Sequence, residues 1–141
     1  MKKTAVVYKS KYGSTKKYAE WIAEALGCDV FELSEAKSET LSGYDVIVYG
    51  GGTYAGRING IKAFLKLAAV LNGKIFAAFV VGTAIPNADE LEKISSFNLG
   101  EAFKDKIKIF PLGGKLYLDE LKGFDKLMMK TLYTVRVQYR C

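Results

Sequence analysis

TAVVYKSKYGST, residues 4–15, is the stretch that decides the fold of this chain. Its first part is rich in β-branched and apolar side chains and predicts a short β-strand over residues 4–8. A polar loop follows, and from residue 14 to about residue 26 apolar side chains recur at helical spacing. Gly27 then matches the glycine that commonly ends a helix. A strand, a polar loop and an amphipathic helix in this order indicate the first part of a βαβ unit.

The same alternation continues along the chain. Hydrophobic patterns predict further strands over residues 28–33, 45–49, 75–81 and 107–112, and helices over residues 60–71, 88–103 and 124–138. Residues 75–81 are apolar on both faces, which is typical of a central strand in a parallel sheet that helices cover on both sides. Because crossovers between parallel strands are right-handed, the five strands predict an α/β fold with a doubly wound parallel sheet. Ligands of such sheets bind outside the carboxyl ends of the strands, where the winding reverses.

The size of the chain suits one globular domain. It has 141 residues, of which 50% are hydrophobic, and we expect residues 1–141 to form a single domain. The longest apolar run, residues 75–85, is shorter than the roughly 20 residues that a membrane-spanning helix needs. Met and two lysines lead directly into the first strand, so we expect no secretory signal. Two cysteines, Cys28 and Cys141, provide no disulfide framework. We therefore expect a cytoplasmic protein in which Cys28 is a small buried residue.

The absence of histidine and the distribution of charge limit the chemistry. Without histidine there is no Ser-His-Asp triad, no His-Cys nucleophile pair and no histidine zinc site. A bound cofactor would therefore supply the reactive group of an enzyme. The net charge is +6, and it is concentrated in residues 1–17 and 104–141, whereas residues 18–103 are acidic. A basic surface attracts phosphates, acidic proteins, nucleic acid or anionic lipid, and solvated lysines without a function explain the charge equally well.

The first of three loops at the expected carboxyl edge of the sheet is suited to a phosphate group. Gly13 allows a tight turn, and Ser10, Ser14 and Thr15 offer hydroxyl groups. The free amide groups of the first helical turn point to the same place, and helix N-termini of this kind bind anions. An ordinary Ser/Thr helix cap with a turn glycine is the alternative interpretation.

The second loop, GGGTYAGR over residues 50–57, combines glycines with the aromatic side chain of Tyr54. Glycines allow main-chain groups to approach a flat ring, and a tyrosine face allows stacking, although a flexible loop with an incidental tyrosine is the alternative. The loop matches neither the dinucleotide fingerprint nor the P-loop motif. Arg57 is either a cation close to the bound group or a solvated surface residue. In the third loop, Gly82 and Thr83 can approach the polar edge of a ring, or form a simple turn.

These loops carry a family resemblance. Residues 10–15 resemble the loop that holds the phosphate of flavin mononucleotide (FMN) in flavodoxins, and residues 50–57 resemble the flavodoxin segment whose aromatic side chain stacks on the isoalloxazine ring. The resemblance implies a flavodoxin-like fold with strand order 2-1-3-4-5, FMN as the cofactor, no catalytic side chain and no metal. It implies the following FMN-binding residues: Ser10, Lys11, Tyr12, Gly13, Ser14, Thr15, Gly51, Gly52, Thr53, Tyr54, Ala55, Gly56, Gly82 and Thr83. The chain departs from the family at Tyr12, where flavodoxins usually have a hydroxyl residue, and in the third loop, which lacks a second aromatic.

The C-terminal part resembles one branch of this family. Residues 113–117, GGKLY, and residues 124–130, FDKLMMK, are similar to the bacterial flavodoxin-like protoporphyrinogen oxidases that pass electrons to quinones. That resemblance implies oxidation of a tetrapyrrole that carries carboxylates, with a respiratory quinone as acceptor. Four basic residues would suit the acidic substrate or an anionic membrane surface: Lys115, Lys122, Lys126 and Lys130.

Three functions follow from these observations as alternatives. The first is an FMN-dependent electron carrier or small oxidoreductase whose partner is a redox protein or a quinone. The second is a quinone-dependent protoporphyrinogen oxidase of haem biosynthesis, with an acidic small molecule as substrate and peripheral membrane contact through the basic C-terminal region. The third is a signalling or scaffold domain that has lost its cofactor. We expect no nucleic-acid partner.

Overall fold

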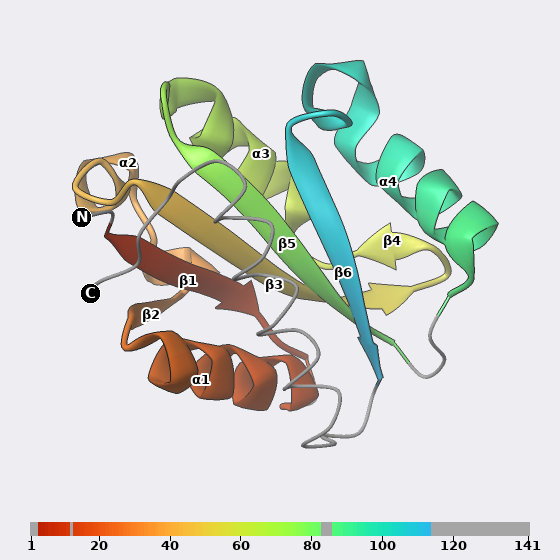
Figure 1. Ribbon diagram of the computed structural model, residues 1–141, viewed down its shortest axis with the longest axis horizontal. Helices are drawn as coiled ribbons and strands as arrows, with labels where there is room; N and C mark the ends of the chain where they lie inside the picture. The colour runs from red at the N-terminus through yellow and green to blue at the C-terminus, as the bar shows by residue number, and fades with distance from the viewer. Residues whose placement is uncertain (1–2, 12, 83–85, 114–141) are drawn as a thin grey trace.

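A parallel β-sheet sets the architecture of the protein (Figure 1). The computed structural model describes residues 3–11, 13–82 and 86–113, and the helix predicted over residues 124–138 lies outside them. The parallel strands pair in the order β2-β1-β3-β5-β6, which confirms the order 2-1-3-4-5 expected of five successive parallel strands. Their bounds are β1 (Thr4–Lys9), β2 (Asp29–Glu32), β3 (Val46–Tyr54), β5 (Ile75–Gly82) and β6 (Ile107–Gly113).

Helices cover both faces of this sheet. α1 (Ser14–Leu26) packs on one face, and α3 (Ile61–Val70) and α4 (Ala88–Phe103) lie on the other, as Figure 1 shows. Two short elements that the sequence did not predict, the 3-10 helix η1 (Leu33–Glu35) and α2 (Ser38–Leu41), connect β2 to β3. Right-handed crossovers on either side of the switch point place helices in this way, so the doubly wound fold is confirmed.

The face that α1 covers has its own hydrophobic core. Tyr18 and Ile22 of α1 are completely buried, and they belong to one cluster with Val6, Val48 and Phe79 of the sheet. Their spacing of four residues places both side chains on the same side of the helix. The amphipathic pattern predicted for residues 14–26 therefore exists because this helix side packs on the sheet.

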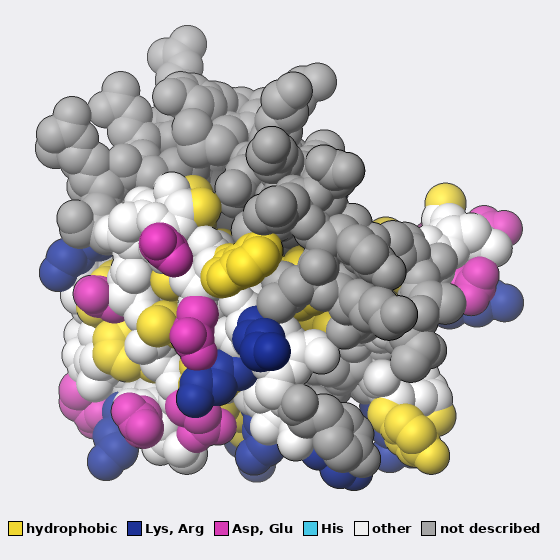
Figure 2. Space-filling model, turned by 90° about the horizontal axis from the view of Figure 1, so that it is seen from below, with side chains coloured by type: hydrophobic (Ala, Val, Ile, Leu, Met, Phe, Trp, Pro, Cys, Tyr) yellow, Lys and Arg dark blue, Asp and Glu magenta, His cyan; other side chains and the backbone are white. Residues whose placement is uncertain are grey.

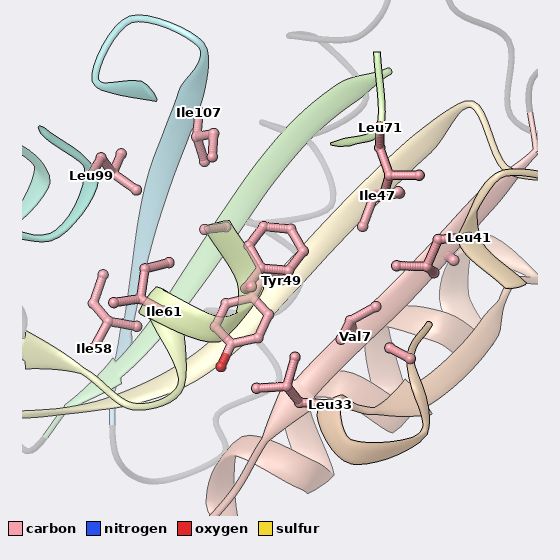
Figure 3. Packing of buried hydrophobic residues seen from close by; sticks show 14 of the residues in the cluster. Val7, Leu33, Leu41, Ile47, Tyr49, Ile58, Ile61, Leu71, Leu99 and Ile107 are labelled. Atoms are coloured by element: carbon pink, nitrogen blue, oxygen red, sulfur yellow. The ribbon is translucent and has the colours of Figure 1, made fainter. Parts of the chain in front are cut away.

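The opposite face has a second core, which is built around Tyr49 (Figure 3). The Tyr49 ring stacks on Phe64 of α3 with ring centroids 4.5 Å apart, and both side chains are completely buried. The Tyr49 hydroxyl donates a hydrogen bond of 2.5 Å to the backbone carbonyl of Asn59. Burial, together with the negative charge of Glu32, raises the pKa of Tyr49. The phenol consequently stays protonated and keeps this donor role at ordinary pH.

β3 is longer than the sequence predicted. The glycine-rich segment that was expected to be a loop continues β3 to Tyr54, turns at Ala55 and Gly56, and returns as β4 (Arg57–Ile58), which pairs antiparallel with β3. Both turn residues have positive φ, 51° and 79°, as the common type I′ hairpin turn requires. The composition was misleading because glycine normally weakens a strand and marks a loop.

The first two glycines of this segment are required by close packing. A Cβ atom on Gly50 would collide with the ring of Phe79 on β5. A Cβ atom on Gly51 would lie only 2.7 Å from the carbonyl oxygen of Asn59. Atoms of the protein itself therefore occupy the space that a side chain would need at Gly50 and Gly51. At Gly52 a Cβ atom would make only ordinary van der Waals contacts.

The expectation of a small, buried Cys28 is wrong. Cys28 is half-buried rather than buried. Across the described ranges, no helix combines the length and the apolar character needed to cross a membrane.

Replacing Gly50 by alanine tests the close packing between β3 and β5. We expect Gly50→Ala to lower the free energy of unfolding by about 1–3 kcal/mol, the usual cost of overpacking a core. Urea denaturation followed by circular dichroism measures this change. Gly43→Ala is the matched control, because its nearest neighbour would lie 4.0 Å from the new Cβ atom, and it should change the stability by less than about 0.5 kcal/mol. Equal stabilities of the two variants would show that Phe79 does not restrict this position.

Candidate functional site

A cavity of about 620 Å³ lies at the carboxyl ends of β1, β3 and β5. Cofactor and small-molecule sites usually measure roughly 300–1,000 Å³, so the cavity has the size of such a site. It is placed where the winding of the sheet reverses between β1 and β3. The lining residues are Lys11, Ser14, Thr15, Gly52, Thr53, Tyr54, Arg57, Ile58, Asn59, Val81 and Gly82.

The cavity brings together predicted residues from all three loops. Those that line it are Lys11, Ser14, Thr15, Gly52, Thr53, Tyr54 and Gly82. Predicted residues that do not line it are Ser10, Gly13, Gly51, Ala55 and Gly56, whereas Tyr12 and Thr83 lie outside the described residues. The cavity also includes Arg57, whose role was left open, and Ile58, Asn59 and Val81, which the sequence did not indicate.

The N-terminus of α1 forms one end of this cavity. Gly13 is the N-cap residue and has a φ of 95°, a left-handed conformation that glycine adopts readily. Its amide donates a hydrogen bond of 3.0 Å to Oγ of Ser10, so the Ser10 hydroxyl shapes the loop. As a glycine, this N-cap residue has no side chain that could cap the first turn. Ser14 and Thr15 of that turn line the cavity. Uncapped amides, the positive end of the helix dipole and two hydroxyls form a donor set suited to an anion.

Gly52 and Thr53 of β3 form one wall of the cavity. A Cβ atom on Gly52 would lie 3.5 Å from Oγ1 of Thr15, so the missing side chain leaves open space beside the first turn of α1. Oγ1 of Thr53 donates a hydrogen bond of 3.3 Å to the carbonyl of Val81 and ties β3 to β5. The amide of Asn59 donates to the carbonyl of Gly52 at 2.8 Å. These bonds fix the wall and leave the Gly52 side accessible to a ligand.

Tyr54, the last residue of β3, also lines the cavity. The residue is 87% exposed, which is unusual for so large an aromatic residue. Arg57 is its cross-strand partner in the hairpin, and both residues line the cavity. An exposed tyrosine ring on a short, hydrogen-bonded hairpin provides a face on which a flat ligand can stack.

Asn98 of α4 holds the hairpin in place through its side-chain amide. Nδ2 donates to the carbonyl of Gly56 and to the carbonyl of Ile94, both at 2.8 Å, and Oδ1 accepts a 2.9 Å hydrogen bond from the amide of Ile58. The sequence did not point to this residue. An asparagine in the middle of a helix is a weak signal, because asparagine has low helix propensity and competes for backbone hydrogen bonds.

The charge of the cavity is positive. Among its described lining residues, Lys11 and Arg57 are the charged ones, and none is acidic. The surface seen in Figure 2, by contrast, carries basic side chains next to acidic ones. In the part of the chain that the structure describes, no group of three His, Cys, Asp or Glu side chains is placed to hold a metal ion. An anionic ligand suits this electrostatic environment.

Together these features define an α/β protein with a cavity that suits a mononucleotide with a flat ring. The N-terminus of α1 suits a phosphate, and the exposed Tyr54 ring in the lining of the same cavity suits stacking.

Comparison with known proteins identifies the family. The flavodoxin domain matches residues 5–139, so the chain belongs to the flavodoxin family, and its cofactor is FMN. An uncharacterized protein of Methanocaldococcus jannaschii is 32% identical over 84 residues, and the match covers 58% of this chain and 54% of that protein. The chain thus spans about half the length of this relative.

Solved structures of flavodoxins have the same fold. A flavodoxin from the domain Archaea superimposes with a TM-score of 0.67 at 21% identity, covering 96% of this chain and 99% of that one. A WrbA-like flavodoxin from Agrobacterium tumefaciens gives a TM-score of 0.70 at 20% identity, with 96% and 98% covered. The flavodoxin of Streptococcus pneumonia TIGR4 gives 0.68 at 19% identity, with 93% and 98% covered.

Removing the Asn98 amide tests its role in positioning the hairpin. Asn98→Ala leaves the Ile58 amide and the Gly56 carbonyl without this partner, and we expect the free energy of unfolding to fall by about 1–3 kcal/mol. Ser96→Ala on the exposed side of the same helix is the control for the higher helix propensity of alanine and should be neutral or slightly stabilising. Chemical denaturation of both variants provides the comparison. An Asn98→Ala variant as stable as Ser96→Ala would contradict the role.

Proposed function

We propose that this protein is an electron carrier that uses FMN. The observation that carries the proposal is that the uncapped N-terminus of α1 and the exposed ring of Tyr54 lie on one cavity. When it is bound, FMN supplies a ring that accepts and releases one or two electrons. The work of the protein is then to bind, orient and electrically tune this ring.

Each part of the site has a separate task in this proposal. Ser14, Thr15 and the amides of the first turn of α1 hold the phosphate, with Lys11 as a cation on the same loop. Gly52 leaves room for the body of the cofactor, and Tyr54 stacks on its ring. Exposure of Tyr54 keeps the ring end open to an electron donor or acceptor.

The carrier function needs no general acid or base among the residues that line the cavity. Among the described lining residues none is Asp, Glu, Cys or His, while Lys11 and Tyr54 carry groups that can exchange protons. A carrier needs no such group because its partners exchange electrons with the cofactor itself. Its partner is a redox protein or a quinone. We expect no nucleic-acid partner.

Oxidation of an acidic tetrapyrrole with a quinone as acceptor stays a prediction, as does membrane contact through the basic C-terminal region. The segments that carry both predictions, residues 113–117 and 124–130, lie almost entirely outside the described residues. A cofactor-free signalling or scaffold role and a cytoplasmic location likewise stay predictions. Flavin content separates the scaffold role from the other two functions, and oxidation of protoporphyrinogen in the presence of a quinone separates the carrier from the oxidase.

Filling the space at Gly52 tests where the cofactor binds. We expect Gly52→Val to raise the dissociation constant for FMN at least about tenfold, or about 1.4 kcal/mol, because the new side chain enters the cavity beside Thr15. Titration of flavin fluorescence measures the affinity. Gly43→Ala, on the surface away from the cavity, is the control and should bind FMN like the unmodified protein. Normal FMN affinity in a folded Gly52→Val variant would refute the site.

A further inference from the structure

We propose that Arg57, which lines the cavity and whose guanidinium contacts Phe97 of α4, sets the redox preference of this site, because its positive charge favours the reduced, negatively charged form of the bound flavin. The inference rests on the proposed function and adds to it a residue that raises the reduction potential of the bound flavin.

Arg57 is placed beside the aromatic end of the cavity by the pairing of the hairpin. It is the first residue of β4, and Tyr54 is its direct partner on β3. Directly paired residues of antiparallel strands project from the same face, with Cβ atoms about 4.5–5.5 Å apart. Both side chains line the same cavity. The position that offers a stacking surface and the position that offers a permanent cation are therefore neighbours.

α4 fixes the guanidinium as well as the backbone of the hairpin. Cζ of Arg57 lies 5.7 Å from the centroid of the Phe97 ring, within the range of a cation–π contact. Phe97 is 65% exposed, and its ring face holds the cation in this contact. The next residue along the helix, Asn98, binds the backbone of Gly56 and Ile58 on either side of Arg57. Two consecutive residues of α4 thus restrain Arg57 from both sides.

The charge of Arg57 acts in a cavity whose described lining contains no carboxylate to neutralise it. Two electrons and one proton convert oxidised flavin into its anionic reduced form, so the ring gains one negative charge. An arginine stays protonated throughout the accessible pH range. It therefore attracts the reduced ring more strongly than the oxidised ring, and this difference in binding raises the reduction potential by linkage.

Potentiometric titration of the FMN-loaded protein tests this inference. At a pH where the reduced flavin is anionic, Arg57→Gln should weaken the binding of reduced FMN relative to oxidised FMN about tenfold, which lowers the midpoint potential of the two-electron couple by about 30 mV. Arg57→Lys keeps the charge, and its midpoint potential should stay close to that of the unmodified protein. Phe97→Leu keeps Arg57 but removes the aromatic ring that it contacts. This variant should lower the midpoint potential by a smaller amount.

Lys62→Gln is the matched control, because Lys62 is an exposed cation on α3 that does not line the cavity. The midpoint potential of the Lys62→Gln variant should equal that of the unmodified protein. An unchanged potential in FMN-loaded Arg57→Gln, or an equal fall in Lys62→Gln, would overturn the role of Arg57 and leave the proposed carrier function intact. A protein that retains no FMN at all would instead overturn the proposed function and this inference with it.

Discussion

Parallel pairing between β1 and β3 is the constraint on which the rest of the structure depends. Thr4 pairs with Val46 and the register runs without a break to Lys9 and Gly51. Because both strands run in the same direction, they end at the same edge of the sheet, and the loop after β1 lies beside Gly52. β2 pairs with the other side of β1, so the winding reverses at this point and the crossovers leave a cavity between them. The anion site and the ring-binding end are separate in sequence and adjacent in space for this reason.

Three consecutive glycines of β3 show how fold and function share one short segment. Gly50 is needed because the ring of Phe79 fills its side-chain position, and Gly51 because the Asn59 backbone passes close by. Neither residue lines the cavity. Gly52 alone contributes its missing side chain to the site. The first two glycines let β4 and β5 pack closely against β3, and this packing gives the wall of the cavity its fixed shape.

The sequence predicted the strands and helices well because a parallel sheet with helices on both faces imposes strong hydrophobic patterns. It predicted the position of the cavity because strand ends and helix N-termini can be recognised from Gly13, Ser14 and Thr15. The hairpin was missed since its turn is Ala-Gly rather than the typical Asn-Gly, and its glycines suggested a loop. Contacts that depend on tertiary structure, such as those of Asn98 with the hairpin and of Arg57 with Phe97, leave no local pattern to detect.

A comparison of the affinities for FMN and riboflavin tests the central claim most directly, because the two ligands share the ring and differ in the phosphate. If the N-terminus of α1 holds the phosphate through several charge-assisted hydrogen bonds, FMN should bind at least about a hundredfold more tightly, which corresponds to about 2.7 kcal/mol. Isothermal titration calorimetry of the cofactor-free protein provides both constants. Equal affinities, or no binding of either ligand, would contradict the account.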